Sequence, residues 1–143
     1  MLDATPSERL LKIGEVAERA GLSLRTIRYY EEMELVVPET RTDGGFRLYT
    51  EDHLNRLALV RRMKPLGFTL QEMRELLEAR ESLLDEPDDA TARRRLAELA
   101  ELGAQRTEDL AAKARRGNEL VELLRRESRG EAPPAVPPEF FEA

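Results

Sequence analysis

Residues 12–31 read KIGEVAERAGLSLRTIRYYE, and this stretch decides the fold. Apolar residues at positions 13, 16, 17 and 20 share one face of a helix, which Gly21 then ends. Ser23 stands at the N-cap position of a second helix, with Leu24, Ile27 and Tyr30 facing inward. Two short helices at this spacing predict a helix-turn-helix, although any small helical hairpin has the same pattern.

A hairpin pattern follows the two helices. Residues 42–45 read TDGG between two short runs. Asp-Gly at such a place is a strong hairpin signal, because glycine supplies the positive φ that a tight turn needs. Arg41 and Arg47 lie on the two strands, so the ribbon would present two guanidinium groups. A hairpin beside a helix-turn-helix is typical of a wing, and the alternative is an ordinary exposed hairpin.

Capping signals predict two more helices before residue 87. Thr50 caps a helix that ends near Pro65. Thr69, with a glutamate three residues later, forms a capping box for a helix from residue 70 to about residue 84. Pro87 cannot continue that helix and separates it from the rest of the chain.

Residues 90–127 are predicted to form one long helix. Such a helix has no domain of its own to bury its apolar positions against, which favours pairing with a second copy over folding back on its own domain. Its apolar register is interrupted in the middle by Gly103, Arg106, Lys113 and Gly117. The leucines expected at the dimer interface are Leu96, Leu99, Leu110, Leu120 and Leu124.

The composition excludes several classes of protein. The chain has 143 residues, a net charge of −6 and no cysteine, which excludes disulfides and thiolate metal sites. Its single histidine, His53, does not supply a catalytic constellation, so we expect no enzyme activity, no metal and no cofactor. No apolar run is long enough to span a bilayer, and residues 1–6 lack secretory-signal features, so we expect a cytoplasmic protein without membrane association.

Three motifs within residues 12–80 resemble the MerR family of transcription regulators. They are IGEVA at 13–17, RYYE at 28–31 and GFRLY at 45–49. The pairing of the last two motifs at this spacing is highly specific. The long helix followed by a short tail also matches the layout of the family, though not residue by residue.

The resemblance implies a mainly α fold. A winged helix-turn-helix DNA-binding domain would occupy residues 12–82, and a long antiparallel coiled-coil dimerisation helix would occupy residues 88–127. We expect residues 1–11 to be a flexible N-terminus and residues 128–143, which contain two Pro-Pro pairs, to be a disordered tail.

The resemblance also implies a function. Such proteins are homodimers that bind pseudo-palindromic promoter DNA and distort it so that RNA polymerase can use it. By position, the recognition helix would supply major-groove residues, its tyrosine a phosphate contact, and the two wings further contacts to DNA. The implied DNA-binding residues are Ser23, Arg25, Thr26, Arg28, Tyr29, Arg41, Phe46, Arg47 and Tyr49, with Lys64 in the second wing.

Two departures from the family pattern leave the effector ligand open. The chain has no cysteine for sensing metals or redox state, and about sixteen residues follow the long helix where drug-sensing members carry a sizeable domain. The sequence leaves two alternative functions open. A DNA-architectural protein of the excisionase type would not need the long helix, and a protein-interaction adaptor would not need arginines at positions 25, 28, 41 and 47.

Overall fold

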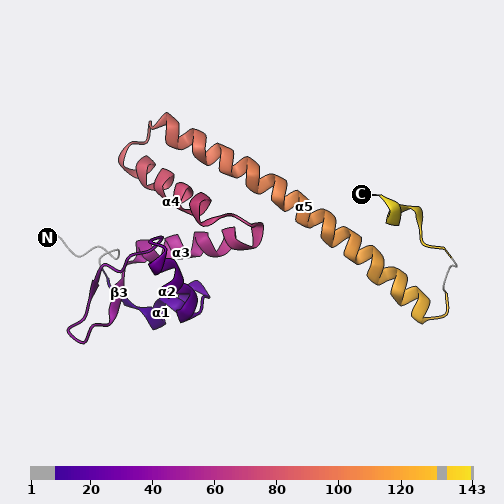
Figure 1. The fold of residues 1–143 in the computed structure, drawn as a ribbon, viewed down its shortest axis with the longest axis horizontal. Helices are drawn as coiled ribbons and strands as arrows, with labels where there is room; N and C mark the ends of the chain where they lie inside the picture. The colour runs from indigo at the N-terminus through magenta and orange to yellow at the C-terminus, as the bar shows by residue number, and fades with distance from the viewer. Residues whose placement is uncertain (1–8, 132–134, 143) are drawn as a thin grey trace. The chain divides into compact units, whose positions relative to one another are not determined.

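The computed structural model describes residues 9–131 and 135–142. It divides into two compact units, residues 1–100 and residues 101–143, which are described separately. None of the helices in the described ranges is long and apolar enough to cross a membrane. The elements, labelled in Figure 1, are β1 (Leu11–Lys12), α1 (Ile13–Ala20), α2 (Leu24–Glu32), β2 (Thr40–Arg41), β3 (Arg47–Tyr49), α3 (Glu51–Met63), the 3-10 helix η2 (Lys64–Leu66), α4 (Leu70–Asp85), α5 (Ala90–Ser128) and the 3-10 helix η3 (Pro138–Phe141).

The helix-turn-helix predicted from residues 12–31 is confirmed. Helix α1 ends at Gly21, whose φ of +68° lies in the left-handed region that glycine tolerates. Helix α2 begins after Ser23, whose hydroxyl oxygen accepts a hydrogen bond from the Thr26 backbone N–H. Ile27 and Tyr30 of α2 are buried, as the sequence predicted, but Leu24, which was also expected to face inward, is 40% exposed.

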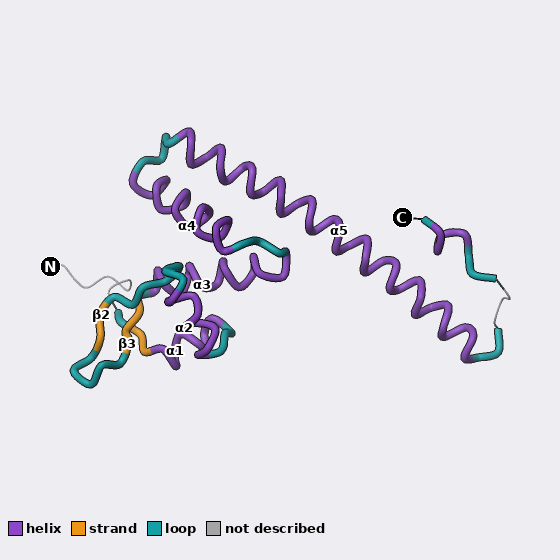
Figure 2. The backbone as a smooth tube through the Cα atoms, in the orientation of Figure 1, coloured by secondary structure: helices purple, strands orange, loops and turns teal. Residues whose placement is uncertain are grey.

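A small antiparallel sheet lies beside the helices, with strand order β1-β3-β2 (Figure 2). Leu11 pairs with Tyr49 across β1 and β3, and both side chains are fully buried. The predicted flexible N-terminus therefore extends too far, because the sheet and the core hold Leu11 in place. Residues 1–8 of that prediction lie outside the described residues.

The wing is the β2–β3 hairpin. Its turn is closed by a hydrogen bond from the Gly45 N–H to the Thr42 carbonyl, and the Phe46 N–H donates to the Thr42 side-chain oxygen. The positive φ falls on Gly45, at +82°, rather than on Gly44 of the Asp-Gly pair. A turn followed by glycine in this conformation is a common way to close a hairpin.

Two capping boxes start the next helices. At α4 the pair is Thr69 and Glu72, as predicted. At α3 the partner of Thr50 is His53: the His53 N–H donates to the Thr50 hydroxyl, and the Thr50 N–H donates to His53 Nδ1 at 3.0 Å. Histidine is an unusual residue for this role, and the sequence rule for capping boxes does not include it.

The capping box at α3 predicts a pH-dependent stability. Burial lowers the pKa of His53 below its usual value of 6.5 in the folded protein. As pH falls, the imidazole therefore takes up its proton more readily in the unfolded chain, which favours unfolding. We expect the melting temperature of the wild type to fall between pH 7.5 and pH 5.5. His53→Gln keeps an acceptor for the Thr50 N–H and should flatten that decrease. An equal decrease in both proteins would show that another group is responsible.

The core of the first unit joins the sheet and helices α1–α4. Apolar side chains that are 8% exposed or less come from every one of these elements except β2. The core cluster, which also includes two residues of the loop after α2, consists of Leu11, Val16, Ala20, Ile27, Tyr30, Leu35, Val36, Tyr49, Leu54, Leu57, Val60, Met63, Met73 and Leu77.

The first turns of α5 run back alongside α4 (Figure 1), and both belong to the first unit. Asp89 caps α5 by accepting from the Ala92 N–H, and Arg95 forms an ion pair with Glu75 of α4. Leu99 is only 2% exposed within one chain. Its prediction as a dimer-interface residue is therefore wrong, because its own chain already covers it.

The second unit contains the rest of α5 and the tail. The predicted bounds of the long helix agree with the structure to within one residue at its C-terminal end. The prediction that residues 128–143 are disordered is wrong for part of the tail. Pro137 and Phe140 line a hollow together with Leu123 of α5, which is 6% exposed, and η3 forms there. Residues 132–134 and 143 lie outside the described residues.

Candidate nucleic-acid interface

Helix α2 presents two free cationic side chains. Arg25 and Arg28 are exposed, and in the described ranges neither guanidinium has a hydrogen-bond or ion-pair partner. Tyr29 lies beside them and is 42% exposed. Because Ile27 and Tyr30 hold the opposite side of α2 in the core, these side chains occupy the outward face of the helix.

Ser23 and Thr26 hold the first turn of α2. The Ser23 hydroxyl donates to Thr26 Oγ1 at 2.8 Å and accepts from the Thr26 N–H at 3.0 Å. An N-cap of this kind satisfies a backbone donor that the helix itself leaves unpaired. Both residues therefore fix the start of the helix, beside the arginine-bearing face.

Glu31 joins the end of α2 to the wing. Its carboxylate accepts a hydrogen bond from Arg47 Nε at 2.6 Å and another from the Tyr49 hydroxyl at 2.7 Å. Arg41 lies 3.9 Å from the same carboxylate. Burial alone would raise the pKa of Glu31. The hydrogen bonds from Tyr49 and Arg47 outweigh that effect and hold the pKa below its usual value. The carboxylate is therefore ionised at neutral pH, and its contacts with Arg47 and Tyr49 hold strand β3 of the wing against α2.

The Glu31 cluster corrects one of the predicted DNA contacts, because Tyr49 is fully buried and its side chain cannot reach DNA. The Arg47 guanidinium is bound to Glu31 and is 30% exposed, so it joins the wing to α2, and its contact with DNA stays a prediction. On the outer surface of the wing lie Arg41, which is 49% exposed, and Phe46, which is 70% exposed.

Glu31 is the functional residue that sequence reasoning missed. Its signal was present, because the RYYE motif supplies one carboxylate and the GFRLY motif supplies an arginine and a tyrosine able to bind it. Nothing in the spacing alone brings these motifs together, since Glu31 and Tyr49 are 18 residues apart.

The pairing with Glu31 predicts a stability cost for the loss of Arg47. Arg47→Met keeps the apolar stem but leaves a largely buried carboxylate without its closest charged partner. We expect the free energy of unfolding in urea to fall by about 1–3 kcal/mol. Arg28→Met, at a free guanidinium on α2, is the matched control and should change stability by less than about 0.5 kcal/mol. Equal losses of stability from the two substitutions would contradict the role of Arg47 as the structural partner of Glu31.

Lys64, the residue predicted in the second wing, is exposed at the start of η2. It lies where α3 ends and the chain turns towards α4, and Gly67 then adopts a φ of +74°.

Within residues 9–131 and 135–142, no group of three His, Cys, Asp or Glu side chains is placed to hold a metal ion.

Two family models match the chain. One, described as "MerR HTH family regulatory protein", matches residues 11–80, and the other, "MerR, DNA binding", matches residues 54–125. Among curated proteins, the chain is similar to the HTH-type transcriptional regulator ZntR of Escherichia coli (strain K12), at 49% identity over 71 residues that cover 50% of each protein. It is also similar to the nodulation protein NolA of Bradyrhizobium elkanii, at 41% identity over 85 residues that cover 59% of this chain and 39% of NolA.

A solved structure supports the same relationship. It is that of HiNmlR, described as a MerR family regulator lacking the sensor domain and bound to promoter DNA. The match has a TM-score of 0.61 and 25% identity, and it covers 80% of this chain and 86% of that chain. The chain spans half or less of the length of ZntR and NolA.

Proposed function

The chain belongs to the MerR family of HTH regulatory proteins, and we propose that it is a homodimeric transcription regulator that binds pseudo-palindromic promoter DNA through α2 and the β2–β3 wing. The observation that carries this proposal is the pair of free guanidinium groups, Arg25 and Arg28, on the outward face of α2. Arginine can donate two hydrogen bonds to the O6 and N7 atoms of guanine in the major groove.

The remaining residues supply contacts of a different kind. Tyr29, Arg41 and Lys64 are exposed and suited to phosphate oxygens, which position a protein on DNA without reading its sequence. Phe46 is the exposed apolar side chain of the wing. Ser23 and Thr26 hold the first turn of α2 and can contribute their hydroxyl groups to phosphate or base edges.

A second copy of the chain would pair along α5. Leu110, Leu120 and Leu124 are 44%, 46% and 53% exposed, which is costly for leucine on a helix in water. Leu96 is half-buried beside α4 and contributes less to such a pairing. Two copies related by two-fold symmetry would read two half-sites, and bending the DNA between them would provide control over RNA polymerase. A protein with this role acts in the cytoplasm, where bacterial promoters are transcribed.

Selection from random duplex DNA, followed by footprinting of the selected sequence, tests the proposal. We expect a two-fold symmetric site protected over about two helical turns, with enhanced cleavage at its centre where the DNA is distorted. A symmetric site without central distortion would contradict the proposed distortion of the promoter and leave DNA recognition standing. Absence of enrichment over the random pool would contradict DNA recognition by the chain alone and favour the adaptor.

A further inference from the structure

The recognition helix α2 ends in a strained turn. Glu34 has a φ of +61° and is the one residue other than glycine with a positive φ in the described part of the chain. A side chain in this conformation is strained and persists only where the surroundings hold it. The Leu35 N–H closes the turn by donating to the Tyr30 carbonyl at 2.9 Å. The wing begins a few residues later, so this turn sets how the helix and the wing are joined.

Two arginines bind the carbonyls on either side of Glu34. From α4, Arg74 donates to the Met33 carbonyl at 2.8 Å. From α3, Arg56 donates to the Leu35 carbonyl through Nε and a terminal nitrogen, at 3.1 Å and 2.7 Å. Hydrogen bonds from a charged donor are stronger than neutral ones, and a cation at the C-terminal end of a helix also interacts favourably with its dipole.

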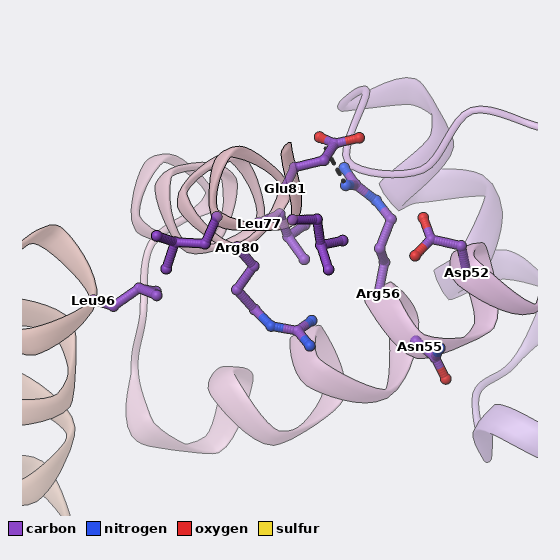
Figure 3. A pocket seen from close by; sticks show the side chains of 9 residues that line it. Asp52, Asn55, Arg56, Leu77, Arg80, Glu81 and Leu96 are labelled. Carbon is purple, nitrogen blue, oxygen red and sulfur yellow. Dashed lines mark ion pairs between the residues drawn. The ribbon is translucent and has the colours of Figure 1, made fainter. Parts of the chain in front are cut away.

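The two arginines occupy different surroundings. Arg56 also forms an ion pair with Glu81 of α4 at 3.6 Å, within a hollow between α3 and α4 (Figure 3). Arg56 therefore has partners on both sides and contributes to joining α3 to α4. Arg74 has its backbone contact at Met33 and otherwise a hydrogen bond to Gln71 on its own helix.

Helix α4 holds neighbouring elements through two adjacent residues. Arg74 binds the end of α2, and the next residue, Glu75, forms the ion pair with Arg95 at the start of α5. All of these residues belong to the first unit. The orientation of the recognition helix is thereby tied to the helix that also holds the beginning of α5.

We propose that Arg74 is a positioning residue for DNA recognition: by holding the Met33 carbonyl it fixes the strained end of α2 to α4, and so sets the angle at which α2 and the wing meet DNA. This inference rests on the proposed DNA-binding function. It does not require Arg74 to touch DNA, and the side chain acts through the backbone of residues 33–35.

Arg74→Gln, compared with Arg80→Gln, tests this role. Both substitutions remove one positive charge from α4, but Arg80 is exposed and makes no hydrogen bond to a backbone carbonyl in the described residues. Affinity is measured by fluorescence anisotropy with the selected duplex, using the full chain. We expect Arg74→Gln to weaken binding about tenfold and Arg80→Gln less than about twofold, because only the first removes a charged hydrogen bond. Arg74→Lys retains one donor and should bind within about threefold of the wild type.

Hydrogen exchange in the free protein supplies a second measurement. The amides of Met33 and Leu35 close the end of α2, and they should exchange faster in Arg74→Gln than in Arg80→Gln. Should Arg74→Gln not fold at the assay temperature, Arg74→Met, which keeps the apolar stem but has no donor, is compared with Arg80→Met in the same two measurements.

The outcomes separate this inference from the function it rests on. Equal losses of affinity for the substitutions at 74 and 80, in a wild type that binds DNA, would overturn the positioning role and leave the proposed function standing. A wild type that binds no selected duplex would overturn both. Slow exchange at Met33 and Leu35 in Arg74→Gln, together with a tenfold loss of affinity, would also overturn the positioning role. Arg74 would then act at the DNA and not through the turn.

Discussion

Arg28→Ala is expected to abolish sequence-specific DNA binding while leaving the thermal melt of the protein almost unchanged. The Arg28 side chain is exposed on α2 and has no partner in the described part of the chain, so its removal leaves no buried group unpaired. In a dimer the substitution appears twice. Since a bidentate arginine–guanine contact is worth about 1–3 kcal/mol, the expected loss is about 2–6 kcal/mol of binding free energy for the symmetric site.

The measurement is anisotropy with the selected duplex and with a scrambled duplex of the same length, together with a circular-dichroism melt. Arg80→Ala, which makes the same charge change on the exposed face of α4, is the control. Arg25→Ala, tested in parallel, identifies which of the two arginines reads a base. A loss that is equal on both duplexes would assign Arg28 to phosphate, and a lowered melting temperature would make it a structural residue.

The local features of the fold could be predicted because short-range rules decide them. Gly21 ends a helix through its φ of +68°, and Ser23 and Thr69 cap helices at the positions where their residue types predict a cap. The capping box of Thr50 and His53 was not predicted, because the sequence rule for capping boxes expects glutamate or glutamine, and not histidine, at the third position of the helix.

The contacts between distant segments could not be predicted from spacing. Tyr49 and Arg47 were expected at DNA because of their position in the family pattern, but both bind the Glu31 carboxylate, and Tyr49 is fully buried. Leu99 satisfied the register of the long helix as well as Leu110 does. In the structure Leu99 is 2% exposed and Leu110 is 44% exposed, a difference that the register does not predict.

The exposure of the long helix predicts where a dimer can be broken. The apolar positions of α5 are interrupted in the middle by two glycines, an arginine and a lysine, so Leu120 and Leu124 carry much of the free apolar surface. Replacing both with glutamate removes that surface and places four like charges in a two-fold interface, where desolvation and repulsion oppose pairing. We expect the double variant to be monomeric in light scattering at micromolar concentration.

The loss of the dimer should also reduce affinity for DNA. A monomer holds one recognition helix and gains nothing from the second half-site, so binding to the symmetric duplex should weaken by at least about a hundredfold, as expected when two linked sites become one. Ala111→Glu is the control, because it adds a charge on the exposed outer side of α5, away from the register of Leu110 and Leu120. It should remain dimeric and bind normally. A dimer that survives Leu120→Glu with Leu124→Glu would place the interface elsewhere, and the free leucines of α5 would then have to be covered by a different partner.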